Sequence, residues 1–184
     1  MQSFVAIPLV ALASPLGGIT PQALTPTDPT AILSATVTTD SAITTQEEQT
    51  RKEHAGEIDA LLAQYDSPLE GYGMKFVTEA EKNDIDWRLL VAIAGRESTF
   101  GLHACKNATN SFLGYGSCKI NFKSVDDAIE KVSASLGGNN PNTAQHYDGK
   151  TTDQILKKYN SVIPGYSKQV QKIMKMVNSD DPIV

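Results

Sequence analysis

The chain has 184 residues and a formal net charge of −5, a length that allows one domain with a sizeable core plus some additional chain. The charge is uneven, because residues 1–65 carry seven acidic and two basic side chains while the remainder balances at fourteen of each. No recognised nucleic-acid-binding motif accompanies the lysines of the C-terminal half, so a nucleic-acid partner is not expected.

The first thirteen residues contain an apolar run of signal-peptide length. The run ends in a small-x-small cleavage pattern, Ala11-Leu12-Ala13. It is short for a transmembrane helix and contains Pro8, so no stable membrane span is expected. No basic residue precedes it, which means that the true start lies upstream or that the segment is not a working signal. We favour export and expect an extracytoplasmic location: secreted, periplasmic or associated with a cell wall.

Residues 14–45 are rich in Thr, Ser, Pro and Ala and contain no aromatic, Lys or Arg residue. Such a segment buries too little surface to offset the entropy of ordering, so we predict a flexible, disordered tether. A few strands within residues 32–43 are the alternative. Residues 46–65 predict an accessory helix that packs on the domain or on another protein, because four apolar residues share one stripe: Ile58, Leu61, Leu62 and Tyr65.

A turn-forming stretch, Asp66-Ser-Pro-Leu-Glu-Gly71, predicts the start of the main domain, residues 66–184. Helical periodicity of apolar residues predicts helices over residues 74–83, 86–101, 124–136, 151–159 and 166–178. Residues 102–121 form a loop rich in Gly, Asn and Ser. No repeat and no alternating strand pattern occurs, so the expected fold class is mainly α.

The second of these helices presents an acidic residue on its apolar face. Glu97 shares a stripe with Leu90, Ile93 and Ala94, while Asp86 can cap the start of the helix and Gly101 can end it. A carboxylate is rarely left on such a stripe, because removing a charge from water is costly. Apolar neighbours and the negative end of the helix dipole both favour the protonated form, as a general acid requires. The alternative is a structural ion pair, for example with Arg96.

Four motifs follow one another in a particular order along the chain: Glu97-Ser-Thr-Phe-Gly, then Ser111-Phe-Leu-Gly-Tyr-Gly-Ser-Cys-Lys-Ile, then Tyr159-Asn160 and Gly165-Tyr166. This order resembles the lysozyme-like superfamily of peptidoglycan-cleaving enzymes over roughly residues 71–177. The closest branches are the lytic transglycosylases and the endo-β-N-acetylglucosaminidases. The transglycosylase cleft floor usually reads Gly-Leu-Met-Gln, and the nearest segment here is Gly114-Tyr-Gly-Ser117, which leaves the branch open.

The resemblance implies a lysozyme-like helical domain with a Gly-rich cleft loop, acting on the glycan strands of peptidoglycan. Glu97 would serve as general acid/base in cleavage of β-1,4 glycosidic bonds. Sugar rings stack on aromatic side chains, and the candidate substrate-binding residues are Ser98, Gly114, Tyr115, Tyr147, Tyr159, Asn160 and Tyr166. A hydrolase would add a second carboxylate, for which Asp126, Asp127, Asp148 and Asp153 are available, whereas a transglycosylase needs none.

Cys105 and Cys118 bracket the loop that follows Glu97. Their spacing fits neither a zinc site nor a thioredoxin motif. In an exported protein they could form one disulfide bond, and in the cytosol they would be free thiols. The three histidines, His54, His103 and His146, do not cluster in the sequence, and we expect neither a metal nor a cofactor.

The segment from residue 150 to residue 175 contains six lysines and one acid, Asp153. Such a cluster either holds an anionic polymer near the cleft or forms an ordinary solvated helix face. Two other functions are compatible with the sequence. One is a non-catalytic cell-wall binding module on the same scaffold, and the other is an adaptor that assembles through residues 46–65. We expect a monomer.

Overall fold

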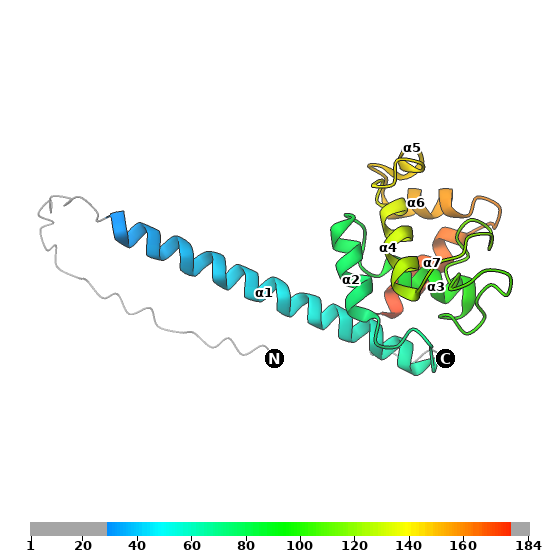
Figure 1. Cartoon of the computed structure of the whole chain (residues 1–184), viewed down its shortest axis with the longest axis horizontal. Coiled ribbons are helices and arrows are strands. Elements are labelled where there is room, and N and C mark those ends of the chain that lie inside the picture. Colours follow the sequence, from blue (N-terminus) through cyan, green and yellow to red (C-terminus); the bar gives the residue numbers. More distant parts are fainter. Residues whose placement is uncertain (1–28, 178–184) are drawn as a thin grey trace, which may run out of the picture. The chain divides into compact units, whose positions relative to one another are not determined.

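The computed structural model describes residues 29–177, with side chains from residue 43 onward. Within this range helices are the only regular secondary structure, so the prediction of a mainly α fold is confirmed (Figure 1). The helices are α1 (Pro29–Gln64), α2 (Gly73–Lys82), α3 (Leu89–Ser98), α4 (Val125–Leu136), α5 (Ala144–Tyr147), α6 (Thr152–Tyr159) and α7 (Tyr166–Met176). The apolar segment 1–13 and residues 14–28 of the expected tether lie outside the described residues.

Helix α1 differs from the predicted tether, because residues 29–45 belong to it. Pro29 occupies the first helical position, where its fixed φ suits the helix and its missing N–H is not needed. Extending an existing helix adds one hydrogen bond per residue, whereas starting one is costly. The composition of residues 29–45 suggested disorder. Composition carries no information on the helix that follows directly in the chain and that these residues extend. None of the described helices combines the length and apolarity needed to cross a bilayer.

The C-terminal part of α1 packs on the domain, as its apolar stripe predicted. Ile58 and Leu62 are fully buried in the core, and Leu61 is nearly so. The Asp59 carboxylate accepts hydrogen bonds from the backbone N–H groups of Gly71 and Gly73, each at 2.9 Å. This part of α1 belongs to the compact unit Ser41–Val184, which contains the candidate site.

Helix α3 lies at the centre of this unit. Every residue from Leu89 to Ala94 is at most 1% exposed, so this part of the helix is surrounded by protein on all sides. Helix α7 packs along α3, and α2 packs against both α3 and α4 (Figure 1). Helix α3 begins at Leu89, three residues later than predicted. Asp86 accepts a hydrogen bond from the backbone N–H of Arg88 at 3.0 Å, which stabilises a turn before the helix.

The N-termini of α4 and α6 follow the predicted capping chemistry. The Ser124 hydroxyl accepts from the backbone N–H of Asp127 at 3.1 Å. Thr151 and Gln154 form a reciprocal capping box, in which each side chain accepts from the backbone N–H of the other. Short side chains with hydrogen-bonding oxygens thus fix where both helices begin.

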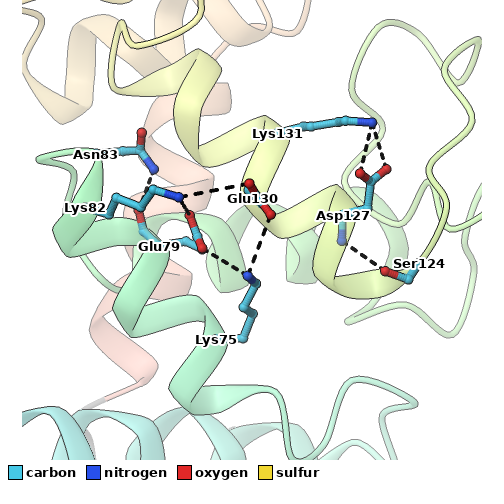
Figure 2. A network of polar contacts seen from close by, with 8 residues as sticks. All are labelled: Lys75, Glu79, Lys82, Asn83, Ser124, Asp127, Glu130 and Lys131. Atoms are coloured by element: carbon cyan, nitrogen blue, oxygen red, sulfur yellow. Dashed lines mark hydrogen bonds and ion pairs between the residues drawn. The ribbon is translucent and has the colours of Figure 1, made fainter.

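Helices α2 and α4 are joined by a network of charged side chains (Figure 2). Glu79 is only 5% exposed and accepts from Lys75 at 3.0 Å, and Lys82 approaches it at 3.4 Å. Both lysines also approach Glu130 of α4, at 3.9 and 4.0 Å. Burial alone would raise the pKa of Glu79, but hydrogen bonding and the positive charges of the two lysines outweigh it and hold that pKa below its usual value.

This lowered pKa predicts a pH-dependent contribution of Glu79 to stability. Because the folded-state pKa lies below the unfolded value of about 4.5, the stabilisation is present above pH 4.5 and is lost as the pH falls through the folded-state value. Glu79→Gln should lower the unfolding free energy by about 1–3 kcal/mol at pH 7, and the difference from wild type should shrink below pH 4.5. Urea denaturation from pH 3.5 to 7 measures the stability loss and its pH dependence.

Glu130→Gln is the matched control, since an exposed partner should change stability by less than about 1 kcal/mol. A pH-independent deficit for Glu79→Gln would contradict this account.

Candidate functional site

The C-terminus of α3 has an unusual backbone conformation directly after Glu97. Thr99 and Phe100 have φ values of 50° and 55°, so the left-handed stop predicted at Gly101 occurs two residues earlier. The Phe100 ring packs against Gly95, where a Cβ atom would lie only 2.6 Å from a ring carbon. Left-handed conformations are costly for residues with a side chain and often occur at functional sites. The chain thus turns sharply at the end of the helix and leaves Glu97 half-buried.

Two other segments hold the Glu97 carboxylate. The hydroxyl of Tyr166, the first residue of α7, donates to Glu97 Oε1 at 2.6 Å. On the other side is Gly114, with φ 68°, where a Cβ atom would lie 2.7 Å from Glu97 Oε2. Only glycine fits this approach without displacing the carboxylate. Tyr166 therefore orients the carboxylate through Oε1, and the close approach of Gly114 limits the space beside Oε2.

Three of the four tyrosines predicted as cleft residues lie next to one another, and one of them, Tyr166, contacts this carboxylate. The Tyr159 ring stacks on the Tyr166 ring, with centroids 6.1 Å apart and planes 12° apart. Tyr115 lies 6.1 Å from Tyr159 at a tilt of 40°. The Tyr159 hydroxyl donates to the backbone carbonyl of Leu113 at 2.6 Å. This hydrogen bond fixes the chain one residue before Gly114, so the tyrosine cluster also positions the glycine against Glu97.

The surroundings of Tyr147, Tyr159 and Tyr166 keep their hydroxyls protonated. Burial raises the pKa of Tyr147 to about 12. The pKa of Tyr166 is also raised, mainly by burial and then by its hydrogen bond to Glu97. Burial raises the pKa of Tyr159 well above its usual value, and the nearby Tyr166 adds to this effect. Tyr166 is therefore a hydrogen-bond donor to Glu97 throughout the physiological pH range.

The loop from Gly101 to Ser124 is fixed by a disulfide bond between Cys105 and Cys118, which confirms the predicted pairing. Their Cα atoms are 5.6 Å apart, within the usual range for a disulfide. The loop also pairs with itself, because Phe122 N donates to the Thr109 carbonyl at 3.0 Å. Phe112 and Leu113 bury their side chains in the core immediately before Gly114. The disulfide thus closes a loop that lies over Glu97.

Removing this disulfide should destabilise the protein. The cysteines are 13 residues apart, and closing a loop of that length is worth about 3 kcal/mol in the chain-entropy account. The double variant Cys105→Ser, Cys118→Ser should therefore lose about 2–4 kcal/mol of unfolding free energy, measured in denaturant against oxidised wild type. Wild type under reducing conditions is the control and should lose a similar amount. An unchanged denaturation midpoint in both cases would show that the disulfide contributes no stability.

Two predicted substrate-binding residues make hydrogen bonds that stabilise the backbone around the site. Ser98 is only 3% exposed, and its hydroxyl donates to the Ala94 carbonyl and accepts from Gly101 N. Its side chain therefore stabilises the sharp turn after α3. The Asn160 side-chain oxygen accepts from the backbone N–H groups of Val162 and Ile163, at 3.2 and 3.1 Å. Asn160 thus orders the turn that leads into α7, and it has no hydrogen bond to Glu97.

The four aspartates considered as a second carboxylate are not brought to Glu97 by any hydrogen bond among residues 43–177. Asp127 accepts from Lys123 N and Lys131, and the first of these contacts lowers its pKa most. Asp153 accepts from Ser167 and pairs with Lys157, which lowers its pKa. Both of these carboxylates have structural partners of their own, whereas Glu97 is oriented by Tyr166.

Arg96 and Gln169 belong to the site although the sequence did not indicate their contact. Arg96 was considered as an ion-pair partner for Glu97, but its Nε donates to Gln169 Oε1 at 2.6 Å. Its guanidinium group lies 6.0 Å from the centre of the Tyr166 ring. Gln169 lies one turn after Tyr166 on α7. In the sequence, only this helical spacing from Tyr166 could have predicted that Gln169 lies near the site.

No protein family, no curated protein and no solved structure matches this chain. The conclusions about function therefore depend on the site itself. Within residues 43–177, His, Cys, Asp and Glu side chains form no group of three that could hold a metal ion.

Proposed function

We propose that this chain cleaves β-1,4 glycosidic bonds of peptidoglycan on a lysozyme-like helical domain, with Glu97 as general acid/base. The observation that carries the proposal is the orientation of the Glu97 carboxylate between the Tyr166 hydroxyl and Gly114. A half-buried acid that has residues of two other segments against its carboxylate suits proton transfer better than it suits an ordinary surface role.

The geometry favours Oε2 of Glu97 as the reacting oxygen, because Oε1 already accepts from Tyr166. In the first step Glu97 gives its proton to the leaving oxygen while the glycosidic C–O bond breaks. In a lytic transglycosylase, the sugar whose anomeric C–O bond has broken then uses its own 6-hydroxyl. This hydroxyl attacks the anomeric carbon and returns its proton to Glu97. In an N-acetylglucosaminidase water takes the place of that hydroxyl. A single oriented acid is sufficient for the first route, and both routes are included in the proposal.

One tyrosine of this cluster, Tyr115, is assigned to the binding of sugar rings. Tyr115 is half-buried, follows Gly114 in the loop, and lies 6.1 Å from the Tyr159 ring. Sugars present apolar faces that stack on aromatic rings. Tyr159 and Tyr166 instead use their hydroxyls inside the protein. Tyr115 is therefore the residue that we assign to direct stacking on the substrate.

An extracytoplasmic location belongs to the same proposal. Disulfide bonds persist in oxidising compartments and are rare in the cytosol. The bond between Cys105 and Cys118 supports export, and export would bring the enzyme to its polymer.

Release of soluble fragments from dye-labelled insoluble peptidoglycan tests this function. The purified protein should release dye in proportion to time and protein concentration. The alternative, a non-catalytic cell-wall binding module, predicts that the folded protein co-sediments with the polymer and releases nothing. Measuring sedimentation and release on the same sample separates the two functions.

A further inference from the structure

The first turn of α7 carries Tyr166, whose hydroxyl donates to Glu97. The residue before it, Gly165, has φ 74°, and no side chain caps the free N–H groups of this turn. A helix end without a cap is held less firmly, because those N–H groups have no partner within the helix. The position of this turn, and of Tyr166 with it, therefore depends on contacts with other elements.

Arg96 on α3 makes such a contact with the first turn of α7. Its Nε donates to Gln169 Oε1 at 2.6 Å. The backbone N–H of Gln169 in turn donates to the Gly165 carbonyl at 3.0 Å, the first hydrogen bond within α7. The Arg96 side chain thus ties the end of α3 to the start of α7.

The Tyr166 ring is held by two aromatic or charged neighbours. The Arg96 guanidinium lies 6.0 Å from the centre of the ring, within the range of a cation–π interaction. The Tyr159 ring stacks on it, with centroids 6.1 Å apart. Tyr166 is only 1% exposed, so these contacts and the surrounding core leave its ring little freedom. The direction of its hydroxyl toward Glu97 is therefore fixed.

The charge of Arg96 also acts on the Tyr166 hydroxyl. Burial raises the pKa of Tyr166, and the hydrogen bond to Glu97 raises it further, whereas the positive charge of Arg96 acts in the opposite direction. A cation near a phenol favours negative charge on its oxygen, which makes the O–H group a stronger donor to a carboxylate. Arg96 therefore strengthens the hydrogen bond that it also helps to aim.

We propose that Arg96 is a positioning residue for the Glu97 reaction, acting through Tyr166, and that Gln169 holds Arg96 in the orientation this role requires. Arg96 and Glu97 are consecutive on α3, so one helix carries both the acid and the residue that positions its donor. With Tyr166 held on Oε1, the other oxygen of Glu97 keeps a fixed direction during proton transfer. The inference rests on the proposed function, because it assigns Arg96 to the reaction of Glu97.

A double-mutant cycle of Arg96→Met and Tyr166→Phe tests this role on peptidoglycan cleavage. Arg96→Met removes the charge and the Nε donor, and it should lower kcat about three- to tenfold with KM unchanged, because Arg96 acts through Tyr166 and not on the substrate. Tyr166→Phe removes only the hydroxyl and should lower kcat about 10- to 100-fold. Adding Arg96→Met to Tyr166→Phe should cause no further loss, since the hydroxyl is already absent. Losses that multiply in the double variant would overturn the assignment.

Gln169 provides a second pair of variants at an exposed position. Gln169→Met removes the oxygen that accepts from Arg96, whereas Gln169→Glu keeps one. The Met variant should lower kcat about two- to fivefold, and the Glu variant should retain more activity. Lys172→Met is the matched control, since it removes an exposed positive charge further along α7 and should leave kcat unchanged. Rates are expressed per folded protein, from melting curves of the same preparations. Equal losses for the two Gln169 variants, or a loss in Lys172→Met as large as in Arg96→Met, would contradict the assignment.

The NMR signal of the Tyr166 hydroxyl proton separates this inference from the proposed function. If folded wild type cleaves no peptidoglycan, the proposed function fails, and the positioning role is judged by this signal alone. A buried hydroxyl that donates to a carboxylate at 2.6 Å should exchange slowly with water and give a downfield signal that Tyr166→Phe lacks. The signal should move upfield or broaden in Arg96→Met and stay at its wild-type position in Lys172→Met. Absence of the signal in wild type, or an unchanged signal in Arg96→Met, would overturn the inference.

Discussion

Replacing Glu97 with glutamine is expected to lower peptidoglycan turnover by about 100- to 10,000-fold, the usual contribution of a positioned general acid. Glutamine keeps the size of the side chain and an oxygen that can accept from Tyr166, but it has no proton to give to the leaving oxygen. The melting temperature should stay the same or rise slightly, because a neutral amide replaces a half-buried carboxyl group. Turnover and thermal melting are measured on the same preparation.

Glu70→Gln is the control for this substitution, since it neutralises an exposed glutamate in the same domain. It should change neither turnover nor melting. If Glu97 instead had a purely structural role, its substitution would destabilise the protein, and turnover would fall only as far as folding does. Turnover near the wild-type rate in a folded Glu97→Gln protein would contradict the enzyme proposal.

Replacing Gly114 with alanine should lower turnover by about 10- to 100-fold. The added Cβ atom would lie 2.7 Å from Glu97 Oε2, so either the carboxylate or the loop must move. A displacement of about 1 Å in a reacting group can cost on the order of 100-fold in rate. The positive φ of this position also makes alanine less stable there by about 1–2 kcal/mol. Steady-state turnover and denaturant unfolding measure the two effects.

Gly149 offers a matched control for the backbone effect. It has φ 63°, close to the 68° of Gly114, but an added Cβ atom would have no neighbour within 4 Å. Gly149→Ala should therefore lose similar stability and keep wild-type turnover. Equal turnover in the two variants would show that the contact between Gly114 and Glu97 has no role in the reaction.

Local sequence patterns were sufficient to predict most of the helices. Helices α2, α4, α6 and α7 lie within two residues of their predicted bounds, because apolar periodicity and capping residues are local signals. The disulfide was also predictable, since Cys105 and Cys118 bracket one loop. The N-terminal part of α1 was missed for the opposite reason. Its helicity continues from a packed segment further along the chain, and its own composition gives no such signal.

The geometry of the site depends on contacts that sequence spacing does not reveal. Tyr166 is 69 residues from Glu97, and Tyr159 is 46 residues from Leu113. Both tyrosines were predicted as cleft residues, but their hydroxyls turn out to bond Glu97 and the loop backbone. Gly114 was expected in the cleft floor. The reason for a glycine at this position is its close approach to the Glu97 carboxylate, which only the folded structure reveals. Ser98 was assigned to substrate from its motif, whereas burial commits its hydroxyl to the backbone.

Mass analysis of the soluble fragments released from purified peptidoglycan tests the central claim most directly. Wild type is predicted to release fragments with newly cut glycan ends. Reducing sugar ends would indicate hydrolysis, and anhydro ends, lighter by one water, would indicate the transglycosylase route. A parallel digest with Glu97→Gln should contain neither reducing nor anhydro ends newly formed on the glycan. Fragments with intact glycan and cut peptides, or no fragments from a folded wild-type protein, would contradict the assignment of Glu97 as the acid that cleaves the glycan.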